Sequence, residues 1–364
     1  MATIGAPDSI AGAAPMKLAF YLPCYWPDTS YPVHRMYDEM VEQAVLAEDI
    51  GMSSLWIPEH HFVNLLVHPS PLLTAVHVAA ATRRIRIGTA VLVLPFYDMR
   101  RLAGEIAQAD QLTKGRLDIG VGRGAFAYEF GHFGVPTEET RDRFDEALEI
   151  LEKLLSNRDV RVDTPRYKFG PITVTPGPYQ KPMPPIWMAA VQPDSIYHSA
   201  RKGYNVTTTA LRSPFQEAQQ QAAAFWRGCE ERALGVRPKI SMLRMGFVCR
   251  DRAEVAEKVA LAAGNDRRHH AMRSPNTEVV HGAIQPRESG RTSQEIENAL
   301  LIGTVDALVE KLGRYAELGI DELILNMSFG ASHGDTMASL ERLATKVMPQ
   351  LGQTAHEKPH AVAV

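Results

Sequence analysis

The chain has 364 residues, of which 45% are hydrophobic and 22% are charged, so it is long enough to bury a large core in one domain or two. A formal net charge of −3 and the lack of a basic block argue against nucleic acid as a partner. No apolar run approaches the roughly 18 residues that suggest a transmembrane span, so we expect no membrane partner either.

The cysteines and the two chain ends set further expectations. Cys24, Cys229 and Cys249 lie far apart without a C-x-x-C or zinc-ribbon spacing, which fits a reduced cytoplasm best. Residues 1–15 are rich in Ala, Gly and Pro but lack the basic and apolar segments of a signal peptide. We expect flexible tails at 1–15 and 352–364 around a single domain at 16–351.

Short apolar runs alternate with segments of helical period, a pattern typical of parallel strands joined by helices. In the first half this pattern predicts strands at 17–23, 53–58, 85–95 and 116–122. It also predicts a helix that ends at Gly51, one with Ser70 as N-cap, and one capped by Asp98 that ends at Gly115. A further apolar helical face runs from Phe144 to Leu155.

The second half continues the alternation after one interruption. Residues 159–185 contain many prolines and predict an inserted hairpin or an extended loop. Four more strands are predicted at 184–190, 205–210, 240–249 and 321–327. Eight alternations in one chain favour a (β/α)₈ TIM barrel with inserted segments over an open doubly wound sheet.

Residues 264–293 fit no predicted element, because they are polar, charged and without sustained period. We expect them to form a mobile excursion from a compact domain. Their position after the seventh strand places them at the mouth where barrel active sites form. One hypothesis is a lid that orders over substrate, and the alternative is a surface loop without a role.

The residues that follow barrel strands point into the mouth and are therefore candidates for chemistry. Glu59, His60 and His61 follow the second strand, and Asn326 ends the eighth. A histidine here can move a proton near neutral pH, bind a metal, or only satisfy local hydrogen bonds. The sequence has no H-E-x-x-H and no clear set of three converging ligands, so we expect no metal site.

The string "GVGRG", residues 120–124, follows the fourth strand and suggests a phosphate site. Its glycines allow close backbone approach, and Arg123 offers a forked, permanently charged donor. Alone the signal is weak, because this is not G-x-G-x-x-G opening a helix after the first strand. At a barrel mouth it indicates a phosphorylated cofactor.

Four strings together resemble the bacterial luciferase-like flavin-dependent monooxygenases: "AEDIGMSSLWIPEHHF", "RIRIGTAVLVLP", "QADQLTKGRLDIGVGRG" and "LGIDELILNMSFG". The resemblance runs from about Met16 to Leu351. It implies a (β/α)₈ barrel, a homodimer, and reduced FMN supplied by a separate flavin reductase. In that family O₂ adds to the reduced flavin to give a 4a-hydroperoxide, which oxidises a small organic substrate such as an aldehyde, ketone, sulfonate or terpene.

The resemblance also assigns residues. His60 matches the catalytic histidine of the "EHH" motif, beside Glu59, and Arg123 matches the arginine that grips the flavin phosphate. The backbone of Gly122, Gly124 and Ala125 would lie at the phosphate, and a non-proline cis peptide under the flavin ring would join Ala90 to Val91. The chain departs from the family at Val191 and Gln192, where small hydroxyl residues usually contact the phosphate. Backbone amides can still bind the anion there, and the departure also allows a different coenzyme.

Two alternatives therefore stay open beside the FMN-dependent monooxygenase. One is an oxidoreductase that uses the deazaflavin coenzyme, which relatives with this barrel employ for hydride transfer. The other is a non-catalytic flavin-binding protein, although His60 argues against it. The substrate is expected to be small and apolar, in a pocket formed by aromatic residues after strand ends: Tyr25, Trp26, Phe96, Tyr97, Phe126 and Tyr128.

Overall fold

A computed structural model describes residues 15–22, 24–211, 213–232, 235–274 and 276–353. Eight parallel strands close into a barrel, because the last strand pairs with both the first and the seventh. The predicted TIM barrel is confirmed. The tails predicted at 1–15 and 352–364 lie outside the described residues, apart from residues 15, 352 and 353.

The barrel strands are short and almost wholly buried. They are β1 (Lys17–Tyr21), β2 (Ser54–Ile57), β3 (Arg86–Thr89), β5 (Leu117–Gly122), β8 (Ile186–Ala189), β9 (Asn205–Thr209), β10 (Ile240–Val248) and β14 (Glu322–Asn326). All eight fall within the predicted strand segments. Inside the barrel Ala19, Tyr21, Trp56, Trp187 and Ile324 pack together.

The third predicted strand, 85–95, is not continuous. β3 ends at Thr89, a cis peptide joins Ala90 to Val91, and the chain resumes as β4 (Leu92–Val93) and a 3₁₀ turn, η2 (Leu94–Phe96). The non-proline cis bond is at the position that the resemblance implied. An unpredicted short strand, β13 (Leu301–Gly303), pairs with the end of β10.

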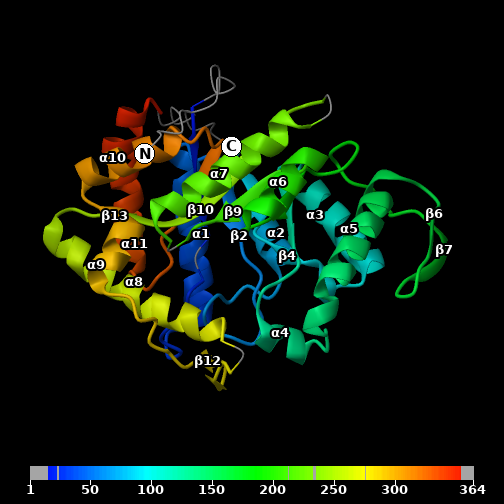
Figure 1. Cartoon of the computed structure of the whole chain (residues 1–364), viewed down its shortest axis with the longest axis horizontal. Helices are drawn as coiled ribbons and strands as arrows, with labels where there is room; N and C mark the ends of the chain where they lie inside the picture. The colour runs from blue at the N-terminus through cyan, green and yellow to red at the C-terminus, as the bar shows by residue number, and fades with distance from the viewer. Residues whose placement is uncertain (1–14, 23, 212, 233–234, 275, 354–364) are drawn as a thin grey trace, which may run out of the picture.

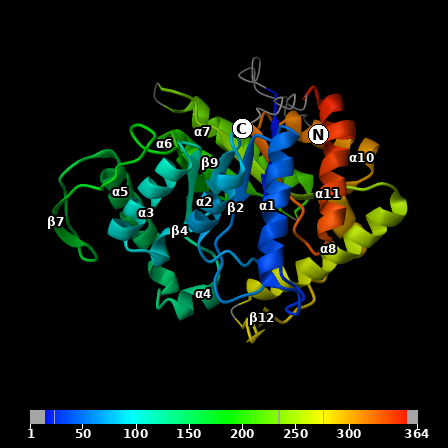
Figure 2. The ribbon, with the colours of Figure 1, turned by 180° about the vertical axis from the view of Figure 1, so that it is seen from behind.

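Helices surround the barrel, as Figures 1 and 2 show from opposite sides. The larger ones are α1 (Val33–Asp49), α2 (Pro71–Ala81), α3 (Met99–Leu112), α5 (Thr140–Ser156), α6 (Pro193–Lys202), α7 (Phe215–Glu230), α8 (Arg252–Met272), α10 (Val305–Ala316) and α11 (His333–Arg342). The predicted caps are confirmed: Ser70 accepts from the Leu73 amide, and Asp98 accepts from the Arg100 amide. In the described part of the chain, no helix combines the length and apolar character needed to cross a membrane.

The shorter helical segments sit at the mouth and near the C-terminus. They are α4 (Ala127–His132), η3 (Thr137–Glu139), α9 (Ser293–Ala299), the π-helical η4 (Leu343–Val347) and η5 (Met348–Leu351). Between α5 and β8 the chain forms an antiparallel hairpin of β6 (Val160–Asp163) and β7 (Lys168–Ile172), which projects from one side of the molecule in Figure 1. Of the two alternatives for 159–185, the structure shows the hairpin.

Residues 264–293 contain more regular structure than predicted. α8 continues to Met272, and a small hairpin follows from β11 (Val279–Val280) and β12 (Ala283–Ile284). The helical period was hidden because α8 buries polar residues, Asn265 and Asp266, where an amphipathic helix would bury apolar ones. The segment lies against the loop after β2, where Asn64 bonds to both Gly282 and Ile284.

Candidate functional site

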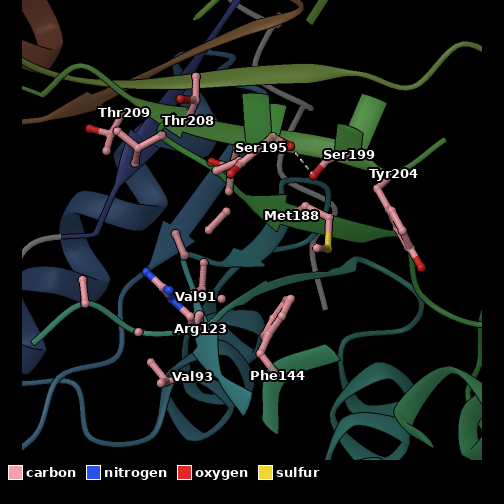
Figure 3. Close-up of a pocket in the computed structure, with 18 of the residues that line it drawn as sticks. Val91, Val93, Arg123, Phe144, Met188, Ser195, Ser199, Tyr204, Thr208 and Thr209 are labelled. Atoms are coloured by element: carbon pink, nitrogen blue, oxygen red, sulfur yellow. Dashed lines mark hydrogen bonds between the residues drawn. The ribbon is translucent and has the colours of Figure 1, made fainter. Parts of the chain in front are cut away.

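A cavity of about 1080 Å³ opens at the C-terminal ends of the barrel strands. It is at the upper end of the roughly 300–1,000 Å³ typical of small-molecule sites. Every residue predicted for catalysis or cofactor binding lines it: Glu59, His60, Ala90, Val91, Gly122, Arg123, Gly124, Ala125, Val191 and Gln192. In Figure 3, Val91 and Arg123 lie on one side of this main cavity, and Ser195, Thr208 and Thr209 lie on the other.

The glycines after β5 bring the backbone of the Arg123 loop close to its neighbours. A Cβ at Gly122 would lie 2.7 Å from the Val91 side chain, so only glycine lets the strand end pass there without displacement. Gly124 has a φ of +84°, which L side chains rarely adopt, and a Cβ there would meet Phe130 and Val93 at 2.8 Å. The sequence "GVGRG" therefore shapes a close-fitting turn that carries Arg123 on the cavity wall.

The Arg123 side chain is exposed, and no acceptor among the described residues pairs with its guanidinium. The N-terminus of α6 also reaches the main cavity, with Gln192 as N-cap and Pro193 at the first position. The first amides of a helix lack partners within the helix and favour anions. Sequence reasoning missed Ser195, a hydroxyl residue in this first turn that lines the cavity and restores a donor absent at Val191 and Gln192.

His60 is held by a carboxylate that sequence reasoning also missed. Glu129, on α4, is 2% exposed, and its Oε1 lies 3.1 Å from His60 Nδ1 and accepts from the His61 amide at 2.8 Å. An ionised carboxylate can only accept a hydrogen bond, so this pairing requires the proton of the neutral ring on Nδ1. Nε2 has no hydrogen-bond partner among the described residues. The only sequence signal was a lone Glu in "AFAYEF", which points to no function by itself.

Glu59 is paired with His61 and not with His60. Its Oε1 lies 2.8 Å from His61 Nε2, and its Oε2 accepts from the Val93 amide at 3.0 Å, so it ties the end of β2 to β4. Burial, reinforced by the charge of Glu59, raises the pKa of Tyr97. His60 and His61 are thus each paired with a carboxylate, Glu129 and Glu59 respectively, and of the two imidazoles His60 lines the main cavity.

The structure divides the aromatic residues expected in the substrate pocket. Phe126 lines the main cavity, 5.2 Å from the His60 ring between centroids. Tyr25, Trp26, Phe96 and Tyr128 are not in its wall, and neither are Tyr97 and Asn326. Their surfaces are used elsewhere: Tyr25 packs against Met272 and Ile284, and Phe96 stacks on Phe133 at 4.3 Å. Trp26 donates to the Tyr31 carbonyl.

The donor set fits an anionic organic cofactor. An unpaired guanidinium, a helix N-terminus and a turn that a Cβ would obstruct all border the same cavity. Within the described residues, no three His, Cys, Asp or Glu side chains converge as a metal site would require.

Comparison with known proteins gives a consistent result. The family model for luciferase-like monooxygenases matches residues 18–322. The oxygenase component of flavin-dependent trigonelline monooxygenase from Acinetobacter baylyi is 30% identical over 340 residues, which cover 90% of this chain and 93% of that protein. The monooxygenase RslO1 from Streptomyces bottropensis superposes with a TM-score of 0.80 at 25% identity, covering 92% and 99% of the two chains. An F420-dependent secondary alcohol dehydrogenase shares the fold, with a TM-score of 0.72 at 17% identity over 93% and 99%.

Proposed function

Because the chain belongs to the luciferase-like monooxygenase family, we propose that it is the oxygenase component of a two-component flavin-dependent monooxygenase. In this proposal it uses FMNH₂ and O₂ to oxidise a small organic substrate. The observation that carries the proposal is that Arg123 and His60, far apart in the chain, line the same cavity. The named activity of the A. baylyi relative, which is flavin-dependent, supports the oxygenase assignment.

The residues of the site would divide the work between binding and proton transfer. Arg123, the amides at the start of α6 and Ser195 would hold the FMN phosphate, since forked and helix-terminal donors suit a dianion. Reduced flavin supplies the electrons with which O₂ is activated. His60, with Nδ1 directed to Glu129, would present Nε2 to accept or return a proton.

The remaining walls would position the reactants and exclude water. Val91 and Met188 give the main cavity an apolar lining, and Phe126 stands beside the His60 ring. The lid hypothesis for 264–293 remains part of this proposal. It is supported by the contacts of the β11–β12 hairpin with Asn64 in the loop after β2.

The experiment that tests the proposal is oxygen consumption with chemically reduced FMN and a panel of aldehydes, ketones, sulfonates and carboxylates. Uptake of O₂ coupled to an oxygenated product supports it. Hydride transfer to or from the deazaflavin coenzyme without O₂ uptake supports the second candidate instead. That candidate is favoured by one observation, the lack of hydroxyl side chains at Val191 and Gln192. A chain that binds FMN without turnover for any substrate would indicate the non-catalytic alternative.

We also propose a cytoplasmic homodimer that receives FMNH₂ from a separate reductase. The three cysteines are unpaired, as in a reduced compartment. Leu73 on α2 is 72% exposed and Leu112 on α3 is 54% exposed, and these two adjacent helices offer an apolar face for a second copy. Light scattering of the purified chain that returns the monomer mass at micromolar concentration would exclude the dimer.

A further inference from the structure

A second, smaller pocket of about 210 Å³ adjoins the main cavity. The two share Val191 and Thr209 in their walls. The rest of this side pocket comes from the loop between β9 and α7, the start of α7, the end of α8 and the residues before α9, so the segment 264–293 forms half of its lining. The two pockets therefore adjoin at Val191 and Thr209, and a molecule that occupied both would pass beside these two residues.

The wall of the side pocket contains two arginines and three hydroxyl residues, together with two carboxylates, one histidine and two apolar residues. Arg273 is exposed, and no acceptor among the described residues pairs with it. Arg291, whose side chain is 27% exposed, reaches Asp266 at 3.4 Å, a long contact that leaves donors available. His270 and the hydroxyl residues Ser213 and Ser289 complete this part of the wall.

The buried guanidinium of Arg244 lies next to the side pocket without lining it. Arg244 on β10 is 1% exposed and donates to the carbonyls of Ser213 and Ala299. Its Nε and Nη1 have no acceptor in the described part of the chain, and no carboxylate there pairs with it. An arginine does not lose its proton, so this charge is permanent and is screened less than a surface charge.

The formal charges of the arginine and carboxylate side chains around the side pocket sum to +1. Three guanidinium groups, those of Arg244, Arg273 and Arg291, stand at the side pocket against two carboxylates, those of Glu217 and Asp266. A single carboxylate from a ligand would balance the set. The whole chain carries a net charge of −3, so this positive site is a local feature and does not follow from the composition.

We infer that the side pocket binds a carboxylate group of the substrate, while the oxidisable part of the same molecule lies in the main cavity. A forked guanidinium pairs with both oxygens of a carboxylate, and serine hydroxyls add neutral donors. The pocket is too small for a second flavin and suits a carboxylate with a few carbon atoms. The substrate class becomes an organic acid with an apolar body. This inference rests on the proposed function, and its test is chosen to be independent of turnover.

The test compares binding of benzoate and benzamide, which have the same size and differ in charge, to the FMN-saturated full chain by calorimetry. Benzoate should bind at least about 10-fold more tightly than benzamide, and the preference should shrink as salt rises. Replacing Arg273→Gln alone, or Arg273→Gln with Arg291→Gln, should abolish it. Arg287→Gln removes an equal charge from the same segment outside both cavities and should leave benzoate binding unchanged.

Three results would overturn the inference. One is equal affinity for benzoate and benzamide in the unmodified chain. Another is unchanged benzoate binding in the folded Arg273→Gln variant, with folding checked by circular dichroism. The third is a loss of FMN affinity in that variant while riboflavin binding is kept, because the side pocket would then hold the cofactor phosphate. If the chain binds no flavin at all, the proposed function fails, and benzoate titration of the chain alone still decides about the side pocket.

Discussion

The polar groups at the two ends of the barrel differ in how completely they are hydrogen-bonded within the chain. At the N-terminal end, the Glu322 carboxylate accepts from Ser53, Ser54 and Trp56, and Glu48 accepts from three consecutive amides at 83–85. At the C-terminal end, His60 Nε2 and the Arg123 guanidinium have no partner among the described residues. A polar group that is fully paired within the chain stabilises the fold, whereas an oriented but incompletely paired one has capacity for a ligand.

Replacing His60→Ala should give the largest effect at the mouth. We expect turnover to fall by about 100-fold, because a positioned acid or base is lost, while FMN affinity and the melting temperature stay within error. Product formation under single-turnover conditions with FMNH₂ measures the change. His34→Ala, an exposed histidine on α1, serves as the control. Unchanged turnover in the His60 variant would remove its proton-transfer role.

Arg123→Gln should weaken FMN binding by about 30-fold, since a charge-assisted contact to the phosphate is lost. Riboflavin lacks the phosphate, so its affinity should not change. Fluorescence titration with both flavins measures the difference, and Arg158→Gln, an exposed arginine beyond the main cavity, is the matched control. If FMN and riboflavin weaken equally, Arg123 does not contact the phosphate.

Glu129→Gln should lower turnover by about 10-fold, because an amide orients the His60 ring without supplying a charge. FMN affinity should remain that of the unmodified chain, so the experiment distinguishes a loss of His60 orientation from a loss of cofactor binding. Glu138→Gln removes an exposed carboxylate that does not line the main cavity and should have no effect. A Glu129 variant with full turnover, or one that loses FMN, would contradict the positioning role.

The smallest effect is expected at the opposite end, on stability alone. Glu48 is desolvated, yet the amides of Ile85, Arg84 and Arg83 hold its pKa below the ordinary value. Because the folded pKa is depressed, its contribution is present above the unfolded pKa near 4.5 and is lost as pH falls through the folded pKa. Glu48→Gln should cost about 1 kcal/mol at pH 7, and the difference should fade in acid. Urea denaturation at several pH values measures the free energy of unfolding of both chains, with Asp49→Asn as control. An equal loss of stability at all pH values would refute the role of the Glu48 charge.

The barrel could be predicted because each of its strands and helices is indicated by residues that are close together in the sequence. Buried parallel strands read as short apolar runs, and caps such as Ser70 mark where helices begin. α8 beyond residue 263 was missed because it buries Asn265 and Asp266, so its polar inner face conceals the period. The break after β3 was not predicted, since "RIRIGTAVLVLP" is one uninterrupted apolar run, and the family resemblance implied only the cis peptide between Ala90 and Val91.

The candidate site was only partly predictable, for a related reason. His60 and Arg123 follow strand ends, and topology brings all strand ends to one mouth. Glu129 lies on a helix of six residues and is 69 positions from His60 in the chain, so no local sequence pattern predicts their contact. Tyr25 and Phe96 also follow strand ends, but loops packed over them use their surfaces.

The turn after β5 has a consequence for engineering this enzyme. Arg123 and Glu129 are separated by only five residues, and that short stretch includes Gly124, whose backbone angle few residues tolerate. Lengthening or shortening the stretch would move Arg123, the proposed phosphate-binding residue, and Glu129, which contacts the His60 ring, at the same time. If the proposed roles hold, a new loop grafted here to exchange the coenzyme would also disturb His60, so redesign is better directed at the opposite wall, at Val191 and Ser195.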